Sequence, residues 1–331
     1  MRDDSALRIR LFDADRTDTL LTLEEALRLT PSERQLVWFD IEGPLSADDH
    51  AAIRRRFELD DATDRALAGE RDERSGASPE VGLHGRYFHV RLVAAPDPQR
   101  RDVTWLDLVG GPNVVISRHA EPLPLLEAID ERIAADATIG ELDAPEFVAS
   151  VLDAVVTSYL AAVDGIEDEV DLIDAKALGR ERFDDLFGEL IDVRRRVGRL
   201  RRLLARHREL FAILGRREFA HAAAAADPDS LQTVSARFET ALSSVEETRD
   251  LVLGSFEVLM TRTAQRTNDV MRILTVATVL ALPATIVAGF LGMNVTTPLP
   301  DKAGWPFWAI VIGIVTLEAV IVLFARWRRW I

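Results

Sequence analysis

Residues 273–294 read ILTVATVLALPATIVAGFLGMN, and this stretch decides the fold of the chain. It has the roughly 20 residues that an α-helix needs to cross about 30 Å of hydrocarbon. A second apolar segment, residues 307–325, follows after a short connection. Both segments are longer and more uniformly apolar than the helices of a soluble core. The sequence therefore predicts a membrane protein with a hairpin of two transmembrane helices.

The charges that flank the two segments predict their orientation. Three arginines precede the first segment and three follow the second, whereas the connection at 292–306 carries only Asp301 and Lys302. Basic residues concentrate on the cytoplasmic side of membrane proteins. We therefore expect a multi-pass protein of the cell membrane with both termini, including the basic tail 326–331, in the cytoplasm. Four tryptophans at the segment ends suit the membrane–water interface.

A stripe of mostly polar or small residues runs along the first segment. Its members recur every three or four positions, which places them on one side of a helix. One interpretation is close packing between membrane helices. The other is a water-filled pore lined by several copies of the helix, which requires an oligomer because two spans cannot enclose a pore. The stripe consists of Asn268, Met271, Thr275, Thr278, Leu282, Thr285 and Gly289.

Two further residues are unusual within apolar segments. Pro283 removes one backbone donor from the first segment, so a local kink is expected there. Glu318 places an acid in the second segment, where carboxylates are costly and often functional, for example as proton carriers. The alternative for Glu318 is an acid that is protonated or hydrogen-bonded against the neighbouring span.

The tripeptide Gly292-Met293-Asn294 lies at the outer end of the first segment. This placement, together with a long cytoplasmic part, a second span and a basic tail, resembles the CorA family. The run at residues 267–271 also resembles the stalk-to-membrane junction of that family. These proteins are divalent-cation transporters of the magnesium channel type and include a ZntB-like zinc branch. The resemblance covers the architecture of the whole chain, but its specific motifs lie in the last quarter.

The resemblance implies a funnel-shaped homopentamer in membrane lipid, with the first spans lining the pore. Asn294 would present side-chain oxygens to a hydrated ion at the outer mouth, with Gly292 keeping the backbone close and Met293 packing. Leu282 would lie at an apolar constriction and Asn268 near the cytoplasmic exit. Neutral oxygens suit magnesium, because this ion gives up its water shell reluctantly.

Two departures from the family pattern bear on the identity of the ion. Leu291 stands where many magnesium-transporting members have tyrosine, and the loop that follows is not acidic. An acidic loop would concentrate cations at the mouth. The expected cargo is Mg²⁺, with Zn²⁺, Co²⁺ or Ni²⁺ as alternatives and with proton coupling through Glu318 as a variant. No His or Cys lies near the mouth, so a tight zinc site is not expected there.

Composition narrows the function classes. The net charge is −15, and because the last 61 residues carry five basic against two acidic side chains, residues 1–270 carry −18. Such an acidic part argues against nucleic-acid binding, which needs a basic face. The sequence contains neither cysteine nor a P-loop, dinucleotide or nucleophile-elbow motif, so neither a cofactor nor enzyme activity is expected. A non-conducting membrane-anchored helical scaffold is the competing class.

The rest of the chain predicts a soluble part that leads into the membrane. Within residues 1–140 we expect helices at 22–29 and 46–57 and strands at 7–12, 35–41, 87–94, 103–108 and 113–117, with a turn at Gly110-Gly111-Pro112. This mixture indicates an α/β domain. Two long helices follow, one acidic and one basic, and we expect them to run antiparallel with complementary charges. The predicted parts are 1–140, the antiparallel helices at 141–228, a stalk helix at 229–291 that enters the membrane, the outer loop at 292–306, the second span at 307–325 and the tail at 326–331.

Overall fold

The computed structural model describes residues 7–13, 18–68, 78–94, 103–135, 143–179, 183–225, 227–291 and 305–327. The chain divides into two compact units, Met1–Ser255 and Phe256–Ile331. The boundary lies inside one long helix, α8 (Pro228–Leu291), which contributes to both units.

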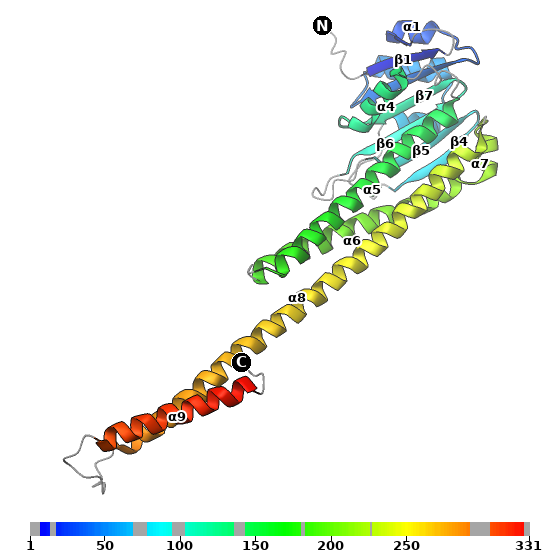
Figure 1. Ribbon diagram of the computed structural model, residues 1–331. Coiled ribbons are helices and arrows are strands. Elements are labelled where there is room, and N and C mark those ends of the chain that lie inside the picture. The colour runs from blue at the N-terminus through cyan, green and yellow to red at the C-terminus, as the bar shows by residue number, and fades with distance from the viewer. Residues whose placement is uncertain are drawn as a thin grey trace. The chain divides into compact units, whose positions relative to one another are not determined.

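A seven-stranded mixed sheet forms the first half of unit 1 (Figure 1). Its strand order is β2-β1-β3-β7-β6-β5-β4, and all neighbours are antiparallel except β3 and β7. Branched and aromatic residues dominate the central strands, as suits a sheet that is buried on both faces. The strands are β1 (Leu7–Asp13), β2 (Thr19–Leu20), β3 (Gln35–Glu42), β4 (Glu80–His84), β5 (Tyr87–Val93), β6 (Trp105–Gly111) and β7 (Val114–His119).

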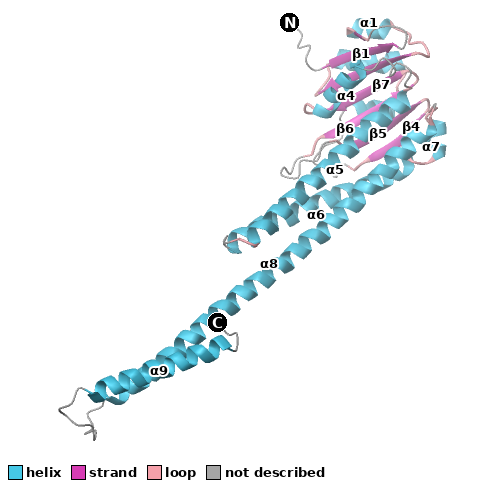
Figure 2. Cartoon of the chain, viewed as in Figure 1, coloured by secondary structure: helices cyan, strands magenta, loops and turns pink. Residues whose placement is uncertain are grey.

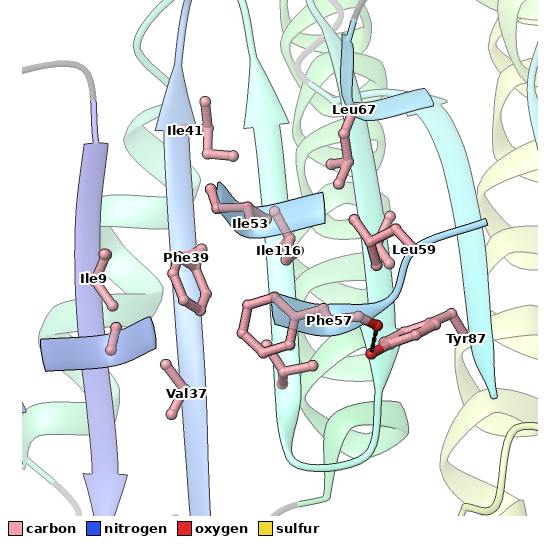
Figure 3. Packing of buried hydrophobic residues seen from close by; sticks show 13 residues of the cluster. Ile9, Val37, Phe39, Ile41, Ile53, Phe57, Leu59, Leu67, Tyr87 and Ile116 are labelled. Atoms are coloured by element: carbon pink, nitrogen blue, oxygen red, sulfur yellow. Dashed lines mark hydrogen bonds between the residues drawn. The ribbon is translucent and has the colours of Figure 1, made fainter. Parts of the chain in front are cut away.

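Helices cover both faces of this sheet (Figure 2). Side chains alternate along β3, so that Phe39 packs with Phe57 on one face while Trp38 packs with Phe147 on the other. Figure 3 shows the first of these layers, in which the Tyr87 hydroxyl donates to the Phe57 carbonyl at 2.5 Å. The helices of the two layers are α1 (Leu23–Arg28), α2 (Ala47–Phe57) and α3 (Asp61–Ala68) on the first face, and α4 (Pro124–Ala135) and α5 (Ala144–Ala177) on the second.

The turn expected at Gly110-Gly111-Pro112 lies slightly later, at Pro112 and Asn113, because β6 continues through both glycines. They pair with Val115 and Val114 of β7. A Cβ atom on Gly110 would lie 2.2 Å from the Phe88 ring, and one on Gly111 would lie 2.2 Å from the Tyr87 ring. The glycines therefore make room for two aromatic rings of β5. The sequence prediction also omitted β2, β4, α4 and the short helix α7 (Arg217–Ala222).

The second half of unit 1 is a bundle of α5, α6 (Phe183–Leu214) and the first part of α8. α5 and α6 run antiparallel and form ion pairs with each other. Lys176 near the end of α5 pairs with Glu189 near the start of α6 at 2.9 Å. About two turns away, Glu169 earlier in α5 pairs with Arg196 later in α6. Their apolar sides interlock through buried leucines and valines.

Val93 at the end of β5 connects the sheet to this bundle. Its partner strand β4 has already ended, so both backbone polar groups of Val93 on that side need side-chain partners. The Val93 carbonyl accepts a hydrogen bond from the Tyr159 hydroxyl of α5, and its N–H donates to Nε2 of His207 on α6 at 3.0 Å. His207 Nδ1 in turn donates to the Leu203 carbonyl at 2.8 Å. His207 must be neutral to accept the Val93 bond.

This connection predicts a pH-dependent stability. Burial lowers the pKa of His207 to about 4, so the unfolded chain binds a proton first as the pH falls below about 6.5. The contribution of His207 is complete above that pH and is lost on the way to about pH 4. We expect the native protein to lose roughly 2–3 kcal/mol more than His207→Gln between pH 7 and pH 4.5.

Urea unfolding of the full chain at the two pH values measures this difference. Exposed His221 on α7 provides the control, since His221→Gln should retain the native pH dependence. An unchanged pH dependence in His207→Gln would show that the histidine does not carry it.

Unit 2 consists of the remainder of α8 and helix α9 (Trp305–Trp327). α8 is continuous through Pro283. The most apolar stretch of α8 is long enough to cross a membrane and none of its residues is buried, and α9 contains an apolar run at Trp308–Phe324. α5 also passes the length and composition test, but half of its apolar stretch is buried in the core of unit 1.

Candidate functional site

The stripe of polar and small residues lies on a free side of α8. All seven of its members are exposed in the single chain. The half-buried residues of this part of α8 form a different set, with Val276, Leu280, Pro283, Ala284 and Val287 three or four positions apart. Because successive helical residues are rotated by about 100°, the two sets are centred on opposite sides of the helix. The stripe is therefore left uncovered by the rest of unit 2.

The hydroxyl groups of the threonines in the stripe donate hydrogen bonds to backbone carbonyls of their own helix. Thr275, Thr278 and Thr285 each donate to the carbonyl four residues earlier, at 2.7, 2.8 and 2.7 Å. Such bonds let a hydroxyl sit in an apolar helix. They leave the oxygen lone pairs as acceptors on the exposed side. Acceptors without competing donors are suited to the water molecules around a cation, since those waters point their hydrogens outward.

Glu318 lies on the covered side of α9. It is half-buried, and the other half-buried residues of this helix, including Val311, Ile314 and Ile321, follow the same spacing of three and four. The acid thus faces the interior of unit 2 with apolar neighbours on its own helix. It belongs to a different helix from the polar stripe.

The tripeptide Gly292-Met293-Asn294 lies outside the described residues, as do the loop at 295–304 and the tail at 328–331. The last described residue before the tripeptide is Leu291 at the end of α8. The stripe ends two residues earlier, at Gly289.

Among the described residues, no three His, Asp or Glu side chains gather in a way that could hold a metal ion. The buried histidines instead have structural partners. His89 Nε2 contacts Asp107 Oδ1 at 3.0 Å, and the same carboxylate pairs with Arg91 at 3.3 Å. His119 Nε2 contacts Asp40 at 3.0 Å. These groups stabilise the sheet and are separate from α8.

Comparison with known proteins identifies the family to which this chain belongs. The family described as CorA-like Mg²⁺ transporter protein matches residues 33–327. The chain belongs to this family. As a CorA-family member it is a membrane transporter and not an enzyme.

Three relatives show the extent of the likeness. The cobalt/magnesium transport protein CorA of Thermotoga maritima is 26% identical over 192 residues, which cover 55% of this chain and 51% of that protein. The divalent cation transporter CmaX of Pseudomonas aeruginosa is 26% identical over 235 residues, 70% of each chain. The complete CorA magnesium transporter structure from Methanocaldococcus jannaschii has a TM-score of 0.71 at 16% identity, over 98% of this chain and 99% of that one.

These comparisons confirm the CorA resemblance and the predicted fold of an α/β part, long helices and membrane spans. The chain spans about half the length of the first relative by sequence, and the whole length of the solved structure by fold. The likeness to the solved Methanocaldococcus jannaschii structure shows a shared fold only, because at 16% identity the roles of individual residues cannot be transferred.

Sequence analysis did not distinguish the arginines of α6 that form ion pairs with other helices from those that line a cavity. Arg196, Arg201 and Arg208 pair with acids on α5 and α8. Arg194, Arg195, Arg199 and Arg202 instead line an open cavity.

Proposed function

We propose that this CorA-family divalent-cation transporter carries magnesium into the cell through a pore formed by five copies of the chain. The α8 helices would surround the pore with their polar stripes facing inward. The single observation that carries the proposal is the position of the stripe. It is exposed along its whole length, opposite the side of α8 that is covered within the chain. A single copy thus leaves an acceptor-lined surface without a partner in an apolar environment, which favours assembly around water.

The tripeptide Gly292-Met293-Asn294 would form the outer mouth in this proposal. The Asn294 amide oxygens would accept hydrogen bonds from the hydrated ion, as the threonine oxygens would further along the pore. Neutral acceptors bind a hydrated divalent ion weakly enough for release. Both termini would lie in the cytoplasm, because arginines flank the membrane ends of α8 and α9 while the connecting loop is nearly neutral.

Zinc, cobalt or nickel transport is the second candidate, and Glu318 favours a proton-coupled form of it. A half-buried carboxylate inside a membrane unit can exchange protons as an ion moves. The family match does not favour the scaffold hypothesis, because the family that matches residues 33–327 is described as a family of transporters.

Ion flux into liposomes tests the choice between these ions. We expect magnesium entry with the native protein, with or without a pH gradient, and the same entry with Glu318→Gln. The protein in detergent should have a mass near five protomers. Zinc entry that requires a pH gradient and disappears in Glu318→Gln would replace the magnesium proposal, and a monomer or dimer would remove the pore.

A further inference from the structure

His119 lies at the end of β7 with both of its ring nitrogens against oxygen atoms. Its side chain is 3% exposed. Nε2 lies 3.0 Å from Oδ1 of Asp40 on β3, and Nδ1 lies 2.6 Å from the Glu121 carbonyl in the connection to α4. A carbonyl oxygen can only accept a hydrogen bond, so Nδ1 carries a hydrogen and donates it. The charge of the ring then depends on whether Nε2 carries a hydrogen as well.

A chain of hydrogen bonds determines the direction of the contact between Nε2 and Asp40. The indole N–H of Trp38 on β3 can only donate, and it donates to the Ser117 hydroxyl of β7 at 2.9 Å. The single hydrogen of Ser117 is directed to Oδ1 of Asp40 at 2.6 Å, a much closer acceptor than the Phe39 carbonyl at 3.5 Å. Because a histidine binds a proton more tightly than a carboxylate does, the hydrogen between Oδ1 and Nε2 belongs to the ring. With a hydrogen on both nitrogens, His119 is a cation.

The groups around His119 favour this charged form. Burial alone would lower the pKa of His119, but the hydrogen bond to Asp40 and the charge of that carboxylate, together with the Glu121 carbonyl and Glu42, outweigh it and raise the pKa above its ordinary value of 6.5. From the other elements on this side of the sheet come Leu106 of β6, Phe147 of α5, and the ion pairs of Asp130 on α4 with Arg10 and Arg8 on β1.

Loss of the proton forces one of the two contacts to open. A neutral ring has one N–H, and its other nitrogen then places a lone pair against an oxygen. The charged carboxylate of Asp40 holds the remaining N–H more strongly than the Glu121 carbonyl does. The backbone of His119 is fixed by pairing with Leu106 and by the N–H of Gly43, which donates to its carbonyl at 2.7 Å. The part that can move is therefore Glu121, which is exposed in the connection between β7 and α4.

We propose that His119 is a pH-sensitive switch, which fastens the β7–α4 connection to the sheet while its ring is charged and releases it in alkaline solution. The contribution of the attachment is complete below about pH 6.5 and is lost as the pH rises through the raised pKa of His119. α4 follows the connection directly and packs against α5. Release thus loosens one layer of helices on the sheet, in the opposite pH direction from the loss at His207.

Exchange of the ring Cε1 hydrogen, followed by mass spectrometry, measures the protonation midpoint of His119 in the full-length protein in detergent. We expect a native midpoint above about pH 6.5. Asp40→Asn keeps an oxygen acceptor but removes the charge, and it should lower the midpoint by about 1–3 pH units. Glu58→Gln removes the same charge from an exposed position after α2 and should leave the midpoint unchanged. A native midpoint at or below about 6.5, or an equal midpoint in Asp40→Asn, would overturn the proposal.

Backbone amide exchange measures the release itself. With rates corrected for the intrinsic effect of pH, protection of residues 120–128 should fall at least about tenfold across the native midpoint, because a hydrogen bond from a charged donor is lost. His119→Gln has no titratable ring, so its protection in this segment should not change over the same pH range. His221→Gln, at an exposed position on α7, should retain the native fall. Constant protection in the native protein, or an equal fall in His119→Gln, would contradict the switch.

Discussion

Replacement of Asn294 by alanine is expected to lower magnesium entry at least about a hundredfold while the oligomer keeps its mass. In the proposed pore, five amide oxygens accept hydrogen bonds from the hydrated ion at the outer mouth. Alanine offers no acceptor, and one substitution changes every copy. Loss of only two hydrogen bonds to a charged species, at about 1.5 kcal/mol each, gives a factor of this size. A magnesium-sensitive dye inside liposomes measures the entry rate.

A control in the same loop separates loss of the filter from damage to the loop. Thr296 lies two residues after Asn294, and Thr296→Ala removes a polar side chain without removing the amide. We expect Thr296→Ala to retain magnesium entry within about threefold of the native rate, since one neutral hydrogen bond contributes only about 0.5–1.5 kcal/mol. If Asn294→Ala retained more than a tenth of the native rate, the filter would have to lie elsewhere along α8.

The second large effect concerns stability and lies at Asp107. This carboxylate is 5% exposed and contacts both His89 and Arg91 across the β5–β6 pair. Arg91 is 4% exposed and its guanidinium lies 5.0 Å from the centre of the Trp105 ring. Asp107→Leu would leave the buried Arg91 charge without its carboxylate. We expect it to lower the free energy of unfolding of unit 1 by about 3–5 kcal/mol.

Urea unfolding followed by tryptophan fluorescence measures this loss, because Trp105 lies beside Arg91, whose carboxylate partner is removed. The exposed pair Arg86–Glu58, at 3.2 Å, supplies the control, and Glu58→Gln should cost less than about 1 kcal/mol. Asp107→Leu combined with Arg91→Leu should recover part of the loss, since no unpaired charge then remains. A loss below about 1 kcal/mol in Asp107→Leu would mean that water reaches Arg91.

The sequence predicted the parts of the fold that depend on long, uniform patterns. The apolar run at 273–294 and the unbroken stretch before it predicted one long helix, and α8 extends from Pro228 to Leu291. The strands at 7–12 and 35–41 were identified from their branched and aromatic residues and are each within one residue of β1 and β3. In these segments local preference and tertiary packing favour the same structure.

The sequence failed where a tertiary contact overrides local preference. Gly110 and Gly111 followed by proline predicted a turn that includes both glycines. The turn instead lies at Pro112 and Asn113, and the glycines continue β6, where the rings of Phe88 and Tyr87 occupy the space of their missing side chains. The bonds from Tyr159 and His207 to Val93 join positions more than sixty residues apart. No local pattern indicates that a strand end needs such partners.

The candidate site was likewise predictable from the sequence only in part. Spacing along the helix identified the polar stripe, but only the structure shows that its side of α8 is exposed while the opposite side is half-buried. Likewise, the count of basic residues on α6 predicted charge complementarity with α5, but it could not separate the paired arginines from those of the cavity. The tripeptide lies outside the described residues, so its role rests on the sequence and on the proposed function.

The central claim is that the polar stripe of α8 faces water in an assembled pore, and the chain itself offers a direct test because it contains no cysteine. Single cysteines at Thr275, Thr278 and Thr285 can be compared with single cysteines at Val276, Val279 and Ile286, each one position further along the helix. A charged, water-soluble thiol reagent is added to liposomes while magnesium entry is recorded.

We predict that the reagent modifies the three stripe positions and blocks magnesium entry through them, while the three neighbouring positions remain unmodified and conducting. This pattern requires the stripe of several copies to surround one water-filled path. Modification and block at the valine and isoleucine positions, with the threonine positions protected, would contradict the pore and assign the stripe to packing between membrane helices.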